Sequence, residues 1–289
     1  MSVNPALIAV IGPVEPALLA AWTAHYRHLG IERFHLAFHF PEHVPDARRH
    51  QLIAAGRELG LPPAAVSTGP WHEHTNTDLR DALREQAGHG WHLLADADEF
   101  QTYPAPLADM IHAADDAGQP VLGGLMLDRV AADGRLAHWR PEQGVDGAFP
   151  LGGHLTHRLL QGDPRKIVLA RSGITVASGN HRAPGHQPDL TALACVHHFK
   201  WRSGVLEDLR RRADRFGCGA WQEHTPAVRE EAARLLEHTA RHDGLIDIAD
   251  PRLAFRRVTL DQMPAGWQHE ARTITTAWHP PQARTNARR

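Results

Sequence analysis

Three acidic side chains follow the hydrophobic stretch at Trp91 within a few positions of one another. Residues 91–100 read WHLLADADEF and contain Asp96, Asp98 and Glu99. In an extended chain alternate side chains share one side, so Asp96 and Asp98 would project together. Two such carboxylates repel each other unless a cation lies between them, and Mg²⁺ or Mn²⁺ prefers oxygen ligands. The spacing therefore predicts a divalent metal position; the alternative is an acidic turn in which Asp98 caps the next element.

The elements that must position these residues alternate between strand and helix. Short apolar runs predict strands over residues 6–12, 33–40, 64–69 and 91–100. Apolar residues at helical spacing, in segments that end near a glycine, predict helices over residues 15–29, 44–60 and 76–88. Such alternation indicates a parallel sheet covered on both faces, which binds ligands at the carboxyl ends of its strands. The acidic cluster closes the fourth strand and so lies at such an end.

The rest of the chain is less regular. We expect a strand over residues 120–130, a strand pair over 166–181 that turns at Ser172-Gly173, and a mobile, Gly-rich loop over 144–157 that serves as a lid or acceptor contact. Farther on, an amphipathic helix is expected over 226–245, with Thr225 as cap and Pro226 at its first position. We find no internal repeat.

Composition narrows the function classes. The 31 Lys and Arg residues nearly balance the 33 Asp and Glu residues, which argues against a nucleic-acid partner. The two cysteines, Cys195 and Cys218, are too few for a disulfide framework and match no zinc knuckle. The first residues lack a signal peptide's basic region, and no apolar run approaches the ~18 residues of a membrane span. We therefore expect a cytoplasmic protein without a membrane partner.

The acidic segment resembles the W-x-x-x-x-D-x-D-E-F box of the family 2-like glycosyltransferases, which have the GT-A fold. Upstream, EPALLAAWTAHYRHLGIERFHLAF is similar to that group's opening, and downstream SGNHRAPG (178–185) and HHFKWRSGVLEDLRRRA (197–213) are similar to its G-N-H and H-F/Y-x-x-R-S segments. The resemblance covers most of residues 6–215. The first and last motifs are fairly specific in combination, whereas each alone is weak.

The resemblance implies an α/β architecture with a GT-A domain over residues 1–216. Within it, residues 1–100 would form a Rossmann-like nucleotide-sugar half and residues 101–216 a mixed-sheet acceptor half. A C-terminal helical extension would follow over 217–276, with packing or homodimer formation as its role, and then a disordered tail over 277–289.

The resemblance also implies a metal site made of Asp96, Asp98 and His198. They would hold Mn²⁺ or Mg²⁺ against the diphosphate of a nucleotide-sugar donor. His197 would face the opposite side if this segment is extended. The alternative is that both histidines are packed or surface residues.

Further nucleotide-sugar contacts are implied around this metal. Lys200 and Arg202 would contact the diphosphate, or else are solvated residues that lead into the following basic helix. Glu15 matches an early family glutamate, although acidic residues are common in a first helical turn. The full predicted donor-binding set is Ile11, Glu15, His39, Asp96, Ala97, Lys200 and Arg202. HFPEH, after the second strand, departs from the family pattern and leaves the nucleotide open.

An inverting transfer also needs a base that takes the acceptor's proton. The candidates are His181, Glu142 and Asp146, with Asp128 as a further one, and His181 gains weight from the G-N-H motif.

The expected activity is therefore metal-dependent transfer of a sugar to a small-molecule or peptide acceptor, with natural-product biosynthesis as the expected setting. A metal-dependent nucleotidyltransferase or phosphotransferase is the main alternative, although IGPVEP lacks the glycine-rich phosphate loop typical of such enzymes. An inactive homologue that binds nucleotide-sugar is a third.

Overall fold

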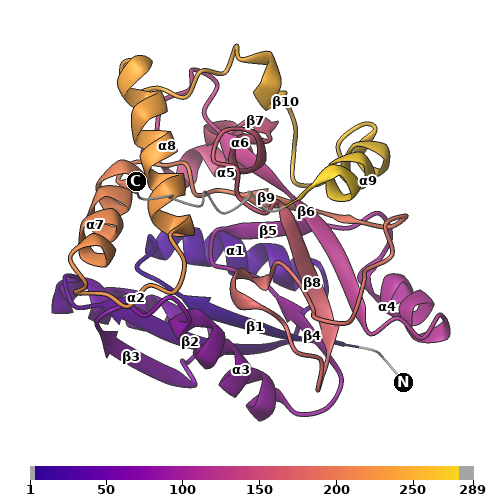
Figure 1. Ribbon diagram of the computed structural model, residues 1–289. Coiled ribbons are helices and arrows are strands. Elements are labelled where there is room, and N and C mark those ends of the chain that lie inside the picture. The colour runs from indigo at the N-terminus through magenta and orange to yellow at the C-terminus, as the bar shows by residue number, and fades with distance from the viewer. Residues whose placement is uncertain (1–3, 280–289) are drawn as a thin grey trace, which may run out of the picture.

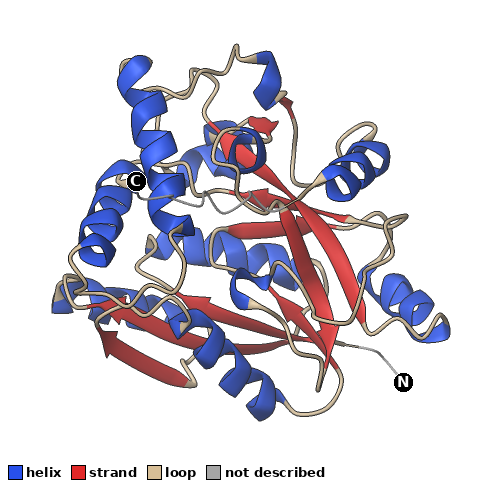
Figure 2. Ribbon diagram, viewed as in Figure 1, coloured by secondary structure: helices blue, strands red, loops and turns tan. Residues whose placement is uncertain are grey.

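A ten-stranded sheet with helices on both faces organises the computed structural model, which describes residues 4–279 (Figures 1 and 2). Its strands are β1 (Ala6–Ile11), β2 (Arg33–Pro41), β3 (Ala65–Gly69), β4 (Trp91–Leu94), β5 (Glu99–Thr102), β6 (Val121–Val130), β7 (Leu151–Gly153), β8 (Arg165–Arg171), β9 (Ala194–His198) and β10 (Arg256–Arg257). The main order is β10-β7-β6-β8-β4-β1-β2-β3, and β9 pairs with both β5 and β6.

The helices are α1 (Pro16–His28), α2 (Asp46–Glu58), α3 (Thr75–Ala87), α4 (Leu107–Asp116), α5 (Gly144–Ala148), α6 (Leu155–Arg158), α7 (Val205–Gly217), α8 (Ala227–Arg241) and α9 (Trp267–Ala277). Short 3₁₀ turns cover Pro141–Gln143, Ser178–Asn180 and Pro251–Leu253.

The first half is the parallel sheet that the sequence predicts. Strands β1, β2, β3 and β4 pair in parallel. Along β1, Leu7 packs with the core beneath α1 and α2, whereas Ile8 packs with the core beneath α3. Both faces of the strand are therefore covered, which explains its unbroken apolar sequence.

The second half is mixed. Strand β8 runs antiparallel to both β4 and β6, and β9 runs parallel to β6 but antiparallel to β5. The expected α/β architecture, with one parallel half and one mixed half, is confirmed.

The fourth predicted strand is wrong in its extent. The chain forms β4, leaves the extended conformation at residues 95–98, and resumes as β5 (Figure 1). The Glu99 amide donates to the Asp96 carbonyl at 3.0 Å and closes this turn. The alternation argument for a shared side therefore does not apply to Asp96 and Asp98.

The predicted strand pair over 166–181 is also wrong in its second strand. β8 ends at Arg171, and arginines of α3 bind the carbonyls that follow it. Arg80 donates to the Val176 carbonyl at 2.5 Å, and Arg84 donates to the Ile174 carbonyl at 2.8 Å. These side chains take the place of a strand partner.

The segment 144–157 was expected to be a loop but forms α5, β7 and most of α6. Its glycines serve close packing. A Cβ on Gly153 would lie 2.6 Å from the Leu253 carbonyl oxygen, and one on Gly152 would lie 2.7 Å from Val258.

Residues beyond 216 pack onto this framework. Helices α7 and α8 lie side by side, β10 extends the sheet next to β7, and α9 covers part of β6 (Figure 1). Helix α8 was predicted to begin at Pro226 but begins at Ala227, with Pro226 as its N-cap residue. The Thr225 hydroxyl bonds to Glu73 at 2.8 Å and does not cap the helix. Helix α9 ends at Ala277, and residues 280–289 of the expected disordered tail lie outside the described residues. No helix within residues 4–279 combines the length and apolar character needed to cross a membrane.

Candidate active site

A cleft of about 610 Å³ lies at the carboxyl ends of β1 and β4. Its walls include Val10 and Asp96 from these strand ends, the loop 177–182 and the first half of α8. Among the predicted site residues, all of which the structure describes, only Asp96 and His181 line this cleft. The location agrees with the position expected for a ligand site in a parallel sheet.

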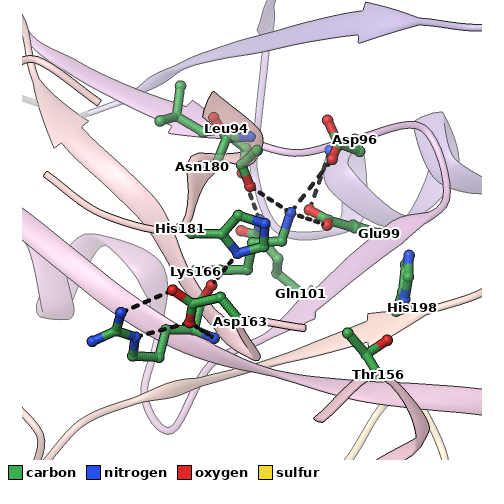
Figure 3. Close-up of polar contacts among 12 residues, drawn as sticks. Leu94, Asp96, Glu99, Gln101, Thr156, Asp163, Lys166, Asn180, His181 and His198 are labelled. Carbon is green, nitrogen blue, oxygen red and sulfur yellow. Dashed lines mark hydrogen bonds and ion pairs between the residues drawn. The ribbon is translucent and has the colours of Figure 1, made fainter. Parts of the chain in front are cut away.

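Lys166 is buried at the base of the acidic turn (Figure 3). Its Nζ lies 2.5 Å from Glu99 Oε1, 3.4 Å from Asp96 Oδ2 and 2.8 Å from the Gly179 carbonyl oxygen. Burial alone disfavours the ammonium form, but the negative charges of Glu99 and Asp96 outweigh it and raise the pKa of Lys166 above its ordinary value. All three ammonium protons have partners, so Lys166 is a fixed positive charge that ties the turn to the loop 177–182.

His181 lies within this loop, and its ring packs against Gly179. Its Nδ1 donates to the Arg165 carbonyl at 2.9 Å, and a Cβ on Gly179 would lie 2.6 Å from the imidazole ring, so glycine is needed there. Burial, and then the charge of Lys166, lower the pKa of His181 to about 4. At neutral pH the ring is uncharged and a weak base, which argues against the role predicted for it.

Asp128 is buried and fully hydrogen-bonded. Its carboxylate accepts from the Thr156 amide at 2.6 Å and hydroxyl at 2.7 Å, from Trp201 Nε1 at 2.7 Å and from His198 Nδ1 at 3.0 Å. Burial would raise the pKa of Asp128, but the hydrogen bonds, that of His198 first, hold it below the usual value. Asp128 is therefore ionised and positions the His198 ring. A carboxylate that already accepts four hydrogen bonds does not fit the predicted role of a base.

The hydrogen bond to Asp128 determines which ring nitrogen of His198 carries the proton. Since an ionised carboxylate only accepts, His198 Nδ1 carries the proton and Nε2 is left for a ligand. His198 pairs with Glu99 across the ladder between β5 and β9, which places it beside the acidic turn (Figure 3). His197 contacts Arg129 at 3.0 Å instead, on the other face of the strand, as the alternation of a strand predicts.

Asp98 lies in the same turn as Asp96, and the charge of His198 acts on its carboxyl. Burial would raise the pKa of its carboxyl, but the charges of His198, Arg202 and Lys200 outweigh burial and lower the pKa below the ordinary value. Carboxylate oxygen and an imidazole that donates its other N–H to a carboxylate are donors that fit a divalent ion. Residues 4–279 hold no group of three His, Cys, Asp or Glu side chains arranged to bind a metal. The predicted set of Asp96, Asp98 and His198 is therefore not gathered into one metal site. A divalent ion held by fewer of these side chains would need substrate phosphates to complete its shell.

The other predicted donor-binding residues divide into two groups. Arg202 lies near the acidic turn but bonds to Glu15 Oε2 at 3.0 Å and to the Phe199 carbonyl, while its buried Nε has no partner within the described chain. Lys200 lies with its Nζ 5.1 Å from the centre of the Trp201 ring. These three residues thus lie around the end of β9, and Glu15 and Arg202 form an ion pair with each other.

The second group lies in the first half and is buried. Ile11 is 0% exposed and Ala97 is 4% exposed, so their side chains face the core. His39 Nδ1 contacts Ser67 Oγ at 2.6 Å, and its ring lies 5.0 Å from that of Trp71 in the cleft wall. Burial lowers the pKa of His39.

Glu142 and Asp146 lie apart from the cleft. Glu142 is exposed in the 3₁₀ turn at Pro141–Gln143. Asp146 binds the buried Arg129 at 2.7 Å and the Leu260 amide at 3.0 Å, contacts typical of a structural residue. The geometry favours neither as a base for chemistry at Asp96.

Two residues of the site were missed from the sequence. Lys166 is the second residue of β8, and nothing in its local sequence distinguishes it from a surface lysine. Glu231 on α8 lines the cleft, and it lies four residues before the buried Leu235 on the same helical face. Helical spacing could therefore have drawn attention to Glu231.

Comparison with known proteins adds little. No protein-family model matches the chain, and no curated protein matches it either. Among solved structures, TarS 1–349 from S. aureus is 13% identical with a TM-score of 0.33, covering 83% of this chain and 74% of that one. The mannosyltransferase PcManGT from Pyrobaculum calidifontis, in complex with GDP-Man and Mn²⁺, is 14% identical with a TM-score of 0.33, covering 82% and 76%.

A putative glucose-1-phosphate thymidylyltransferase from Bacillus anthracis is 8% identical with a TM-score of 0.29, covering 94% of this chain and 96% of that one. At such identities and TM-scores the likeness assigns neither a family nor a substrate.

Proposed function

We propose that the protein is a glycosyltransferase that moves a sugar from a nucleotide-diphosphate sugar to a hydroxyl group of an acceptor. The observation that carries the proposal is the placement of the D-x-D-E segment. It leaves β4 at the carboxyl edge of a parallel sheet, lines the cleft through Asp96, and places Asp98 near His198, whose ring Asp128 orients. The sequence resemblance of the same segment to glycosyltransferases supports the same activity.

Asp98 and His198 would hold Mn²⁺ or Mg²⁺ in this proposal. A divalent ion there would supply Lewis-acid assistance to the departing diphosphate. Because the protein offers two ligands, the ion and the donor's diphosphate should bind together. Asp128 keeps His198 in the tautomer that exposes Nε2.

Lys166 and Arg202 act on the protein side of the donor site. Lys166 holds Asp96 and the loop 177–182 in place and offsets part of the negative charge of the turn. The guanidinium of Arg202 is already oriented by Glu15, so a diphosphate would meet a preorganised cation.

We propose that the two halves of the sheet bind different substrates. Residues 1–100 would bind the nucleotide-sugar and residues 101–216 the acceptor. The segment 217–276 forms part of the cleft through α8, so we propose that it also takes part in acceptor binding.

Isothermal titration of UDP and GDP, with and without Mn²⁺, tests this function. We expect Mn²⁺ to strengthen binding of one of the two diphosphates, and Asp98→Asn to abolish the gain. Asp133→Asn is the matched control, because Asp133 is 61% exposed and pairs only with the exposed Arg135 among the described residues.

Binding that ignores Mn²⁺ and is unchanged in Asp98→Asn would contradict the proposal. So would formation of a nucleotide-sugar from a nucleoside triphosphate and a sugar phosphate with release of pyrophosphate, which would indicate a nucleotidyltransferase.

A further inference from the structure

Glu231 reaches the cleft from a part of the chain that carries none of the glycosyltransferase motifs. It lies in the second turn of α8, whose buried face includes Ala232 and Leu235. Helix α8 packs on α7, and the cleft lining contains both Glu231 and Asp96. A carboxyl group of the C-terminal segment thus shares a cavity with the acidic turn.

The surroundings of Glu231 leave its carboxylate without a partner. Its Oε1 packs against Gly162, where a Cβ would lie only 2.9 Å away. Arg234, three residues farther along the helix, donates instead to the Leu160 carbonyl at 2.7 Å and to Glu230 at 3.1 Å, and Arg229 donates to Glu223 at 2.7 Å. Within residues 4–279 the Glu231 carboxylate has neither a hydrogen bond nor an ion pair. A packed carboxylate that faces a cavity without a partner is available to a ligand.

The electrostatics agree with this geometry. Burial raises the pKa of Glu231, although the charges of Lys200, Arg234 and His198 act against it and that of Asp128 acts with it. The other ionisable residues of the cleft wall are Glu73, His74, Arg80, Asp96, Asp163, His181, Arg182, Arg212, Glu230 and Arg234. A raised pKa makes a carboxylate a stronger proton acceptor near neutral pH, whereas the pKa of His181 is about 4.

The structure assigns Glu231, we infer, as the general base that takes the proton of the acceptor hydroxyl. This inference rests on the proposed function. The acceptor oxygen attacks the anomeric carbon of the donor sugar, and its proton passes to a carboxylate oxygen of Glu231. The bond from the anomeric carbon to the diphosphate oxygen breaks, and its electron pair leaves with the nucleoside diphosphate. Glu231 then releases the proton to water, and the anomeric configuration is inverted.

The test compares Glu231→Gln with the wild-type protein in hydrolysis of UDP-, GDP- and TDP-sugars with Mn²⁺, where water is the acceptor. We expect hydrolysis to fall about 10²–10⁴-fold, the usual contribution of a general base. The Kd for the nucleoside diphosphate should not change, because Glu231 acts on the acceptor. Glu237→Gln on the same helix is the control, because Glu237 is 71% exposed and absent from the cleft lining.

Sodium azide separates a base from a structural residue. Azide has no proton to lose, so it should restore turnover of Glu231→Gln and give a glycosyl azide with inverted configuration. A structural role would not respond to azide. The melting temperature of the variant should equal or exceed that of the wild type, because an unpaired carboxylate in a desolvated position is removed.

Two results would overturn the assignment. If the wild type hydrolyses a nucleotide-sugar and Glu231→Gln does so equally fast, or loses diphosphate affinity in parallel with activity, Glu231 is not the base while the proposed function stands. If the wild type neither binds a diphosphate with Mn²⁺ nor hydrolyses any donor, the proposed function fails and the assignment fails with it.

Discussion

Two sets of charged residues meet at the end of β4, and they differ in how fully they are bonded. In the bonded set, Lys166 has three partners, one of which is Glu99, and Asp128 accepts four hydrogen bonds. In the open set, Asp98 and Glu231 accept no side-chain hydrogen bond from residues 4–279. A buried charge whose hydrogen bonds are satisfied stabilises the structure, whereas an unsatisfied one is available to a ligand. Substitutions in the first set should therefore change stability, and substitutions in the second set should change activity.

The largest effect should come from Lys166→Met in the bonded set. The change leaves Glu99, whose side chain is 2% exposed, without its cation at 2.5 Å. Removing one partner of a buried ion pair costs about 3–5 kcal/mol of unfolding free energy. Urea unfolding without metal measures this loss.

The chain's one other lysine, Lys200, provides the control. It contacts the Trp201 ring at 5.1 Å, so Lys200→Met should cost much less. Equal losses for both variants would show that Lys166 is not specially placed.

An intermediate effect is expected from the two adjacent histidines of β9. His198→Ala should weaken binding of Mn²⁺ together with UDP by at least the ~10–100-fold that loss of an outer-shell partner costs. His197→Ala should leave this affinity nearly unchanged, because His197 is 0% exposed and contacts Arg129 on the other face. Titration with Mn²⁺ in the presence of UDP makes the comparison, and the opposite order of affinities would contradict the orientation of His198.

The smallest effect concerns a fully bonded neutral group, His92. Burial, and then the charge of Arg84, lower the pKa of His92 to about 4 from 6.5. Between these pH values the unfolded chain binds a proton that the folded chain does not, so stability falls as the pH drops from about 6.5 to 4.

Unfolding measured across this pH range should show a shallower slope for His92→Gln than for the wild type. Replacement of the exposed His89 by Gln is the control. Identical slopes for all three proteins would rule out His92 as a source of acid sensitivity.

The sequence predicted what depends on local spacing. The alternation of strands and helices up to residue 94 follows from apolar periodicity, and the orientation of His198 relative to His197 follows from strand alternation.

Contacts between distant segments were not predictable in this way. Lys166 reaches Asp96, and Asp128 reaches His198, each across 70 residues. The carbonyls after β8 bind Arg80 and Arg84, which removes the expected strand. The acidic turn itself forms where Glu99 must return to the sheet beside β9, a pairing that residues 91–100 do not reveal.

The most direct test of the account is a crystal structure with UDP and Mn²⁺, with the ion located by its anomalous scattering. We predict an ion bonded to the Asp98 carboxylate and to His198 Nε2, with Lys166 still paired to Glu99. An ion bound by Asp96 and Glu99 in place of Lys166, or no ion beside a bound diphosphate, would contradict it.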